Sequence, residues 1–111
     1  MMLDRIGTAL EHYMDVLTAR QKLVAGNLAN ADTPGYKARD LAFGTQLEEL
    51  VAGAPPMAVE VAGLKVKNDG NNVNVDREAR LLAENALRFN MATTLLRGQL
   101  RMVRSAIEGG K

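Results

Sequence analysis

The chain has 111 residues, of which 14 are basic and 13 are acidic, giving a formal net charge of +1. This even balance argues against nucleic-acid binding, which requires a strongly positive surface. The absence of cysteine excludes disulfides and thiolate metal sites. With two Phe, two Tyr and no Trp, a single domain of this size buries only a modest core. We therefore expect the isolated monomer to be weakly stable.

Residues 1–36 are predicted to form an N-terminal helix and its terminating turn. Apolar side chains recur every seven positions from Leu3 to Ala31, which predicts a helix of about 28 residues that packs along one seam. Near its C-terminal end the seam becomes polar at Arg20 and Asn27, so we expect the last turns to face polar groups. Charged residues interrupt this stretch from Asp4 onward, which argues against a Sec signal peptide and against membrane insertion. The apolar seam positions are Leu3, Ile6, Leu10, Tyr13, Leu17 and Val24.

The sequence Thr33-Pro34-Gly35-Tyr36 predicts where this helix ends. Pro34 disfavours the helical conformation of the residue before it, and Gly35 tolerates the positive φ that a type II turn requires. We expect Asn30 to bond free backbone groups at the helix end. We also expect the Tyr36 ring to fold back over that end while its hydroxyl stays solvated.

Residues 37–74 are punctuated by glycine and proline and lack a long periodic pattern. Residues 41–51 favour a short helix, and residues 59–75 favour a weak hairpin around a turn at 68–71. Because so short a segment buries little surface by itself, we expect a flexible or partner-ordered connector.

Residues 75–111 contain the most regular pattern, with apolar or small side chains in alternating steps of four and three. Asn74 or Asp76 is a candidate N-cap. The predicted fold is therefore mainly α, with long N- and C-terminal helices paired as an α-hairpin or coiled coil and joined by an irregular, weakly β connector. The large apolar side chains expected in the intrachain seam are Leu82, Phe89, Leu96, Leu100, Val103 and Ile107. The smaller or outermost positions of the repeat are Val75, Ala79, Ala86 and Thr93.

A second apolar line on the same helix lies beside this seam and consists of Leu81, Met91, Leu95 and Met102. A single hairpin cannot bury both lines. A large apolar side chain contributes roughly 1.5–3 kcal/mol when it is fully buried, so we expect this line to contact other subunits. The alternative is that the middle segment covers it.

The residues give no sign of catalysis or of a cofactor. His12, the only histidine, lies beside Glu11 and one turn before Asp15, on an open helix face that lacks the further ligand and enclosing shell of a metal site. Ser105 is the only serine, and the sequence contains no nucleophile elbow and no phosphate-binding glycine loop. We expect no enzyme activity, cofactor or metal site.

The run from Asn27 to Asp40 resembles the motif that ends the N-terminal helix of flagellar axial proteins, which form the rod, hook and filament junction of the bacterial flagellum. Residues 69–78, 83–90 and 101–107 also resemble the proximal rod members of this family. The resemblance implies a structural subunit of the proximal rod of the basal body, assembled through its terminal helices and needed for motility. The motif residues are Asn27, Asn30, Thr33, Pro34, Gly35 and Tyr36.

The resemblance also implies a location in the periplasmic rod, reached from the cytoplasm by flagellar type III export without a cleaved signal peptide. The implied partners are further copies, other rod proteins, the adaptor FliE and the membrane-ring protein. Phe43 and Leu47 are similar to the element that early rod and hook subunits present to the export gate; alternatively, they simply pack together one helical turn apart. Two other functions stay open: a small α-helical hairpin chaperone or adaptor, and the companion proximal rod subunit.

Overall fold

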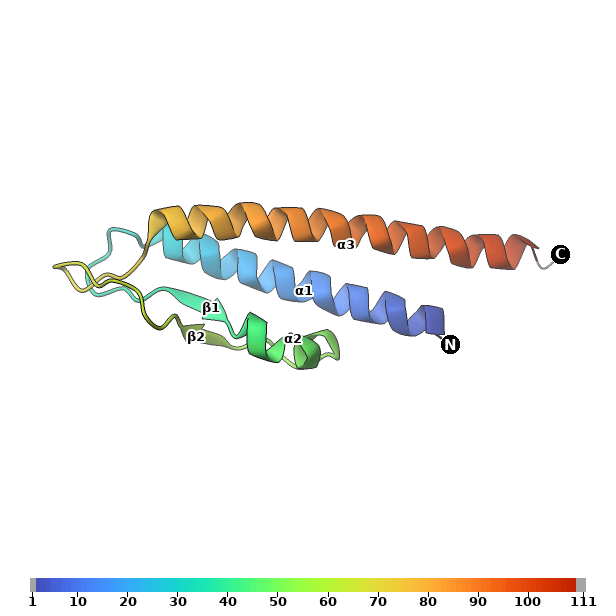
Figure 1. Cartoon of the computed structure of the whole chain (residues 1–111), viewed down its shortest axis with the longest axis horizontal. Coiled ribbons are helices and arrows are strands. Elements are labelled where there is room, and N and C mark those ends of the chain that lie inside the picture. Colours follow the sequence, from blue (N-terminus) through green and yellow to red (C-terminus); the bar gives the residue numbers. More distant parts are fainter. Residues whose placement is uncertain (1, 110–111) are drawn as a thin grey trace.

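Two long antiparallel helices dominate the computed structural model, which describes residues 2–109 apart from the side chain of Leu3. They are α1 (Met2–Ala29) and α3 (Val75–Gly109), and they lie side by side along the molecule (Figure 1). α3 has 35 residues against 28 in α1, and its C-terminal turns extend past the N-terminal end of α1 (Figure 1). The molecule is elongated, 69 × 22 × 16 Å. These features confirm the predicted mainly helical fold with paired terminal helices.

α1 ends at the turn that the sequence predicts. The backbone N–H of Tyr36 donates to the carbonyl of Thr33 over 3.2 Å, and Gly35 has φ +76°, as a type II turn requires. The Tyr36 hydroxyl reaches back to the helix and donates to Oδ1 of Asn27 over 3.2 Å. Nδ2 of Asn30 donates to the Gly26 carbonyl over 2.8 Å. The predicted bonding of Asn30 to the helix end and the folding back of Tyr36 are therefore confirmed. The solvated hydroxyl expected for Tyr36 is wrong, because this hydroxyl bonds to buried Asn27.

The connector forms two short strands with a helix between them: β1 (Arg39–Leu41), α2 (Phe43–Val51) and β2 (Ala58–Glu60). α2 confirms the short helix predicted within residues 41–51. The two strands pair antiparallel, with Asp40 opposite Val59. Both β1 and α2 contact α1 (Figure 1), so the connector runs back along the N-terminal helix.

The hairpin predicted within residues 59–75 is wrong in its pairing. β2 pairs with β1, which precedes α2, instead of with a strand after Gly70. The expected turn is present, because Gly70 N–H donates to the Lys67 carbonyl over 2.9 Å and Lys67 N–H donates to the Asn71 carbonyl over 2.8 Å. β2 selects β1 because β1 is anchored in the core through buried Leu41.

The hydrophobic core lies between α1 and the connector, where side chains from α1, β1 and α2 meet. Burial of these apolar groups holds the connector on α1. Whether residues 37–74 move in solution is a separate question, and their predicted flexibility stays a prediction. The buried cluster consists of Val16, Leu41 and Leu50, with Ala19, Leu23 and Phe43 packed against it.

The face of α3 that meets α1 is rotated by one residue from the predicted seam. Its buried side chains are Glu78, Asn85, Ala92 and Gln99, which repeat every seven residues and precede the predicted positions Ala79, Ala86, Thr93 and Leu100. Polar and small side chains thus occupy the centre of the helix contact. The predicted members Leu82, Phe89, Leu96 and Val103 flank it and are half-buried.

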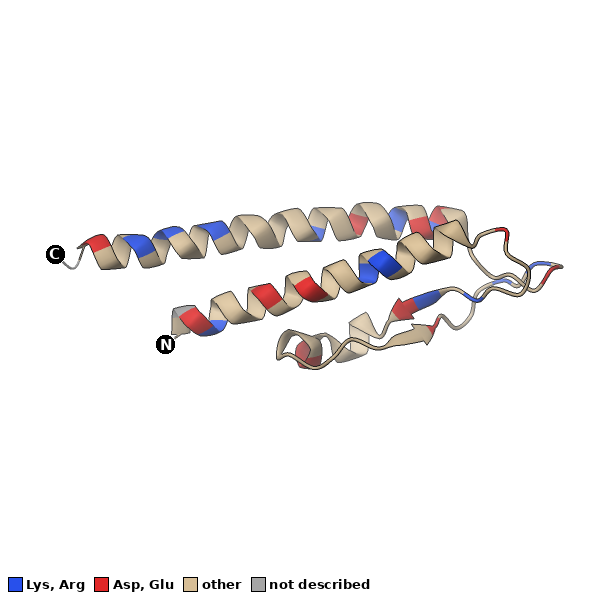
Figure 2. Ribbon diagram, turned by 180° about the vertical axis from the view of Figure 1, so that it is seen from behind, with Lys and Arg blue, Asp and Glu red and all other residues tan. Residues whose placement is uncertain are grey.

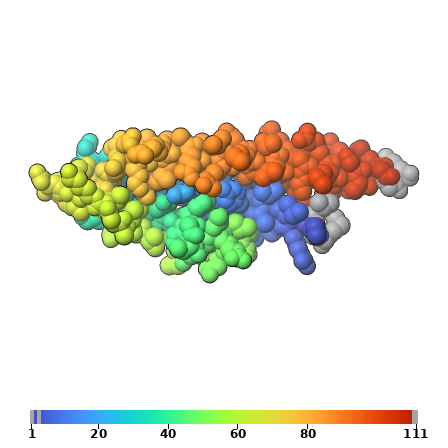
Figure 3. Space-filling model, in the orientation of Figure 1, coloured from blue at the N-terminus to red at the C-terminus, as the bar shows by residue number. Residues whose placement is uncertain are grey.

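Three predicted seam residues are wrong for the intrachain contact: Ile6, Leu100 and Ile107 are 43%, 59% and 69% exposed. Gly7 and Gln99, both buried, occupy the contact beside Ile6 and Leu100, and a Cβ atom at Gly7 would lie only 2.9 Å from Oε1 of Gln99. The red C-terminal end of α3, which carries Ile107, also projects beyond the rest of the molecule in Figure 3. Of the other seam positions in α1, Leu17 and Val24 are buried, Leu10 and Tyr13 are half-buried, and the side chain of Leu3 lies outside the described residues.

Candidate assembly surface

Asn27 joins the end of α1 to β1. It is fully buried, and its Nδ2 donates to the carbonyl of Arg39 over 2.8 Å, while Arg39 N–H donates to Oδ1 of Asn27 over 3.0 Å. The side-chain amide therefore takes the place of a neighbouring strand for one residue of β1. This contact explains why an asparagine at this position of the motif matters to the fold.

The turn after α1 also receives the segment that leads into α3. Nδ2 of Asn71, a fully buried residue, donates to the carbonyls of Asn30 and Thr33, each over 2.8 Å. Gly35 N–H donates to the Asp69 carbonyl over 2.9 Å. The backbones come so close that a Cβ atom at Gly70, whose φ is +87°, would lie 3.3 Å from Cα of Gly35. Two separate stretches with family resemblance thus form one polar junction.

A buried ion pair lies beside this junction. Arg20 donates from Nε and Nη2 to the two carboxylate oxygens of Asp40, both over 3.0 Å. Arg77 extends the cluster, with Nη2 3.8 Å from Asp40 Oδ2 and Nη1 2.9 Å from Glu78 Oε1. The prediction that the last turns of α1 face polar groups is confirmed at Arg20 and Asn27. Oriented ion pairs of this kind define one register of the helices.

The exposed apolar side chains of α3 form a stripe, defined here as Leu87, Met91, Leu95 and Met102. Each is 57–60% exposed. A groove of about 470 Å³ runs between the stripe and α1, with Leu10 and Tyr13 on its opposite wall. Three of the four predicted subunit-contact residues lie in the stripe, and the fourth, Leu81, is half-buried. Sequence reasoning missed Leu87, although its spacing of four from Met91 places it on the same face.

Phe43 and Leu47, which resemble an export element, lie in α2 of the connector. Two guanidinium groups lie over the Phe43 ring, with Cζ of Arg20 4.6 Å and Cζ of Arg88 5.6 Å from its centroid. The centroid of the Tyr13 ring is 6.3 Å away. Hydrogen bonds with Tyr13 and, to a smaller extent, with Glu84 raise the pKa of Arg88. The group beside Phe43 is therefore a cation. Phe43 and its partner Leu47 are both half-buried.

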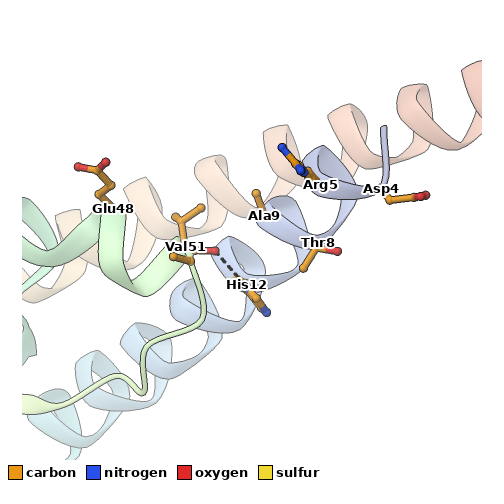
Figure 4. A pocket seen from close by; sticks show the side chains of 8 residues that line it. Asp4, Arg5, Thr8, Ala9, His12, Glu48 and Val51 are labelled. Carbon is orange, nitrogen blue, oxygen red and sulfur yellow. Dashed lines mark hydrogen bonds between the residues drawn. The ribbon is translucent and has the colours of Figure 1, made fainter. Parts of the chain in front are cut away.

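His12 anchors the end of α2 to α1. Its Nδ1 lies 2.8 Å from the carbonyl of Val51, and a Cβ atom at Gly53, with φ +107°, would lie 3.1 Å from its ring. Figure 4 shows this contact beside a groove of about 400 Å³ between α1 and α2. The solvated helix face expected for His12 is therefore wrong, since its ring is half-buried and hydrogen-bonded.

No group of three or more His, Asp or Glu side chains is arranged to hold a metal ion in the part of the chain that the structure describes. Over the same residues, no helix combines the length and the apolar character needed to cross a membrane.

Known proteins resemble this chain over nearly its whole length. Residues 15–37 match the family described as flagella basal body rod protein. The flagellar basal body rod protein FlgB of Salmonella typhimurium is 32% identical over 98% of this chain and 99% of its own length. FlgB of Escherichia coli is 30% identical over the same shares, and FlgB of Bacillus subtilis is 24% identical over 92% of each chain. From the matches in Salmonella and Escherichia, this chain belongs to the FlgB family of flagellar basal body rod proteins.

Proposed function

We propose that this chain, a structural subunit of the flagellar basal body rod needed for motility, builds the proximal part of that rod by packing its terminal helices against those of neighbouring subunits. The observation that carries the proposal is the exposed apolar stripe of α3 with the groove beside it. Each stripe side chain would contribute roughly 1.5–3 kcal/mol if it were fully buried. Exposed apolar surface that is contiguous in this way is typical of an interaction site.

The rest of the fold supports a mechanical role. The two long helices run along the molecule (Figure 1). Asp40 of β1 links them at one end, because its carboxylate binds Arg20 of α1 and lies 3.8 Å from Nη2 of Arg77 of α3. A pair held in a single register resists sliding when torque acts along its axis. A neighbour that meets the stripe with a different surface makes a head-to-tail contact, and contacts of this kind generate open helical polymers when they do not close into a ring.

The same proposal includes the partners and the route of the chain. Its neighbours would be further copies, the other rod proteins, the adaptor FliE and the membrane-ring protein, in the periplasmic part of the basal body. The chain would be exported without a cleaved signal peptide. Export would precede folding, because the Phe43 ring contacts Arg20 and Arg88 once the chain is folded. In the unfolded chain, Phe43 and Leu47 would be free to contact the type III export gate.

Replacement of Leu87 and Leu95 by Glu tests the assembly surface. Both side chains are about 60% exposed, so the folded monomer should survive, whereas rod assembly and swimming should be lost. The matched control is Ala83→Glu with Asn90→Glu, two exposed positions of α3 outside the stripe, which should leave swimming unchanged.

The location of the unaltered chain separates the proposal from its rivals. It should copurify with detergent-extracted basal bodies. Retention in the cytoplasm would instead favour a hairpin chaperone or adaptor. The companion rod protein FlgC is disfavoured because the relatives compared above carry the name FlgB. Those relatives are structural rod proteins, which also speaks against an enzyme.

A further inference from the structure

Three arginines form a basic row on the C-terminal half of α3. Arg97, Arg101 and Arg104 follow one another at spacings of four and three, which places them on one helix face. All three are exposed and line a groove of about 430 Å³ together with Leu100. Within residues 2–109 their side chains form no ion pair. Since like charges one turn apart repel each other, an acidic partner would stabilise this row.

The same chain carries an acidic surface on α1 and α2. In Figure 2 the ribbon is red, for Asp and Glu, at several places along the N-terminal half of α1 and on α2. It is blue, for Lys and Arg, at several places on the C-terminal half of α3. Arg5 is the single basic side chain of α1 before Arg20. The groove of Figure 4 opens between these acidic elements. The acidic surface is defined as Asp4, Glu11 and Asp15 of α1 with Glu48 and Glu49 of α2.

We propose that the basic row of one copy docks on the acidic surface of a second copy, an inference that rests on the assembly proposed above. The three arginine side chains are exposed, which leaves the row accessible to a neighbour, and α3 extends past the end of α1 (Figures 1 and 3). Two different patches of one chain meet in this contact, so copies can join head to tail, and such contacts form an open polymer when the rotation between copies does not close a ring. Two basic rows repel each other, which excludes an arrangement in which one row faces another.

Charge reversal tests the pairing in cells whose only copy of this protein is the variant. The basic-row variant is Arg97→Glu, Arg101→Glu and Arg104→Glu; the acidic-surface variant is Glu11→Lys, Asp15→Lys and Glu48→Lys. Each variant alone should reduce the number of chains in purified basal bodies by about tenfold or more. Expressing both variants together should restore assembly, because the reversed row of one then faces the reversed surface of the other.

The matched control reverses three basic side chains elsewhere: Lys22→Glu, Lys65→Glu and Arg80→Glu, all at exposed positions. It changes the net charge as much as the basic-row variant does, and it should leave assembly unchanged. An equal defect in the control would overturn the inference, since net charge alone would then be responsible. Failure of the two reversed variants to restore each other would also overturn it.

Cysteine cross-linking identifies the partner directly, because the chain has no cysteine of its own. Copies with Arg101→Cys and differently sized copies with Glu48→Cys should form a mixed disulfide adduct in assembled basal bodies. Lys65→Cys, at an exposed position, is the control and should not join to Arg101→Cys. Adducts of Arg101→Cys with itself, or with other proteins only, would overturn the inference.

The two proposals fail in different ways. If the unaltered chain is absent from basal bodies, the proposed function is wrong. If the unaltered chain is present and the basic-row variant assembles and swims normally, the charge pairing alone is wrong.

Discussion

The side-chain amide of Asn27 bonds both backbone polar groups of Arg39, as donor over 2.8 Å and as acceptor over 3.0 Å. Asn27 lies in α1 and Arg39 begins β1, so this one side chain turns the chain back along the helix that it has just left. The Tyr36 hydroxyl donates to the same Oδ1. The helix terminator and the start of the connector are therefore one hydrogen-bonded unit.

We predict that Asn27→Ala lowers the free energy of unfolding by about 3 kcal/mol, because each buried partner left unbonded costs roughly 1–3 kcal/mol. Urea denaturation followed by circular dichroism measures the change. Asn90→Ala, at an exposed position of α3, is the control and should shift the midpoint little. Equal midpoints for the two variants would show that the junction contributes no stability.

The contact between Gly7 and Gln99 predicts different effects for two glycine substitutions. Gly98→Ala should stabilise the chain by about 1 kcal/mol, since nothing lies within 4 Å of the added Cβ and alanine favours the helix. Gly7→Ala should stabilise it less, because the Cβ would lie 2.9 Å from Oε1 of Gln99 and the buried Gln99 amide would have to move. Thermal unfolding of both variants compares the two effects. Equal gains would mean that the Gln99 amide moves away without loss of stability.

Removal of the charge on Asp40 should lower the free energy of unfolding. Asp40→Asn leaves the Arg20 guanidinium buried without its anion, which typically costs about 3–5 kcal/mol. The loss should appear as a lower urea midpoint. The exposed pair Arg80–Asp76 provides the comparison, and Asp76→Asn should cost less than about 1 kcal/mol. Similar losses in both variants would contradict the assigned difference in burial.

Hydrogen exchange should show which parts of the isolated chain are ordered. We predict slow exchange for α1 around Val16 and Val24, which are buried, and fast exchange for residues 100–109 of α3, which are exposed except for half-buried Val103. Incorporation into the rod should slow exchange in residues 100–109. The connector, residues 37–74, should exchange faster than α1. Equal protection of residues 100–109 in the monomer and in the rod would argue against their burial by neighbours.

Local chemistry alone determined much of this protein. A seven-residue repeat indicates the two long helices, and the Pro34–Gly35 pair acts within a few residues, so the end of α1 and its turn follow from the sequence. The roles of Asn30 and Tyr36 at the helix end were also predictable, because both act on groups close to them in the chain. Asn27 was identified through the family resemblance alone. The sequence also predicted three of the four stripe residues, Met91, Leu95 and Met102, because a single helix pair cannot bury a second apolar line on α3.

Tertiary structure decided the rotation of α3 and the partner of β2. Both depend on contacts between residues far apart in the chain: Gly7 admits Gln99, Asn85 donates to the Leu17 carbonyl over 2.8 Å, and Leu41 anchors β1 in the core. Periodicity assigns the largest apolar side chains to a seam. It carries no information on how closely two backbones approach, and that distance, set by small and hydrogen-bonded side chains, turned Leu100 outward.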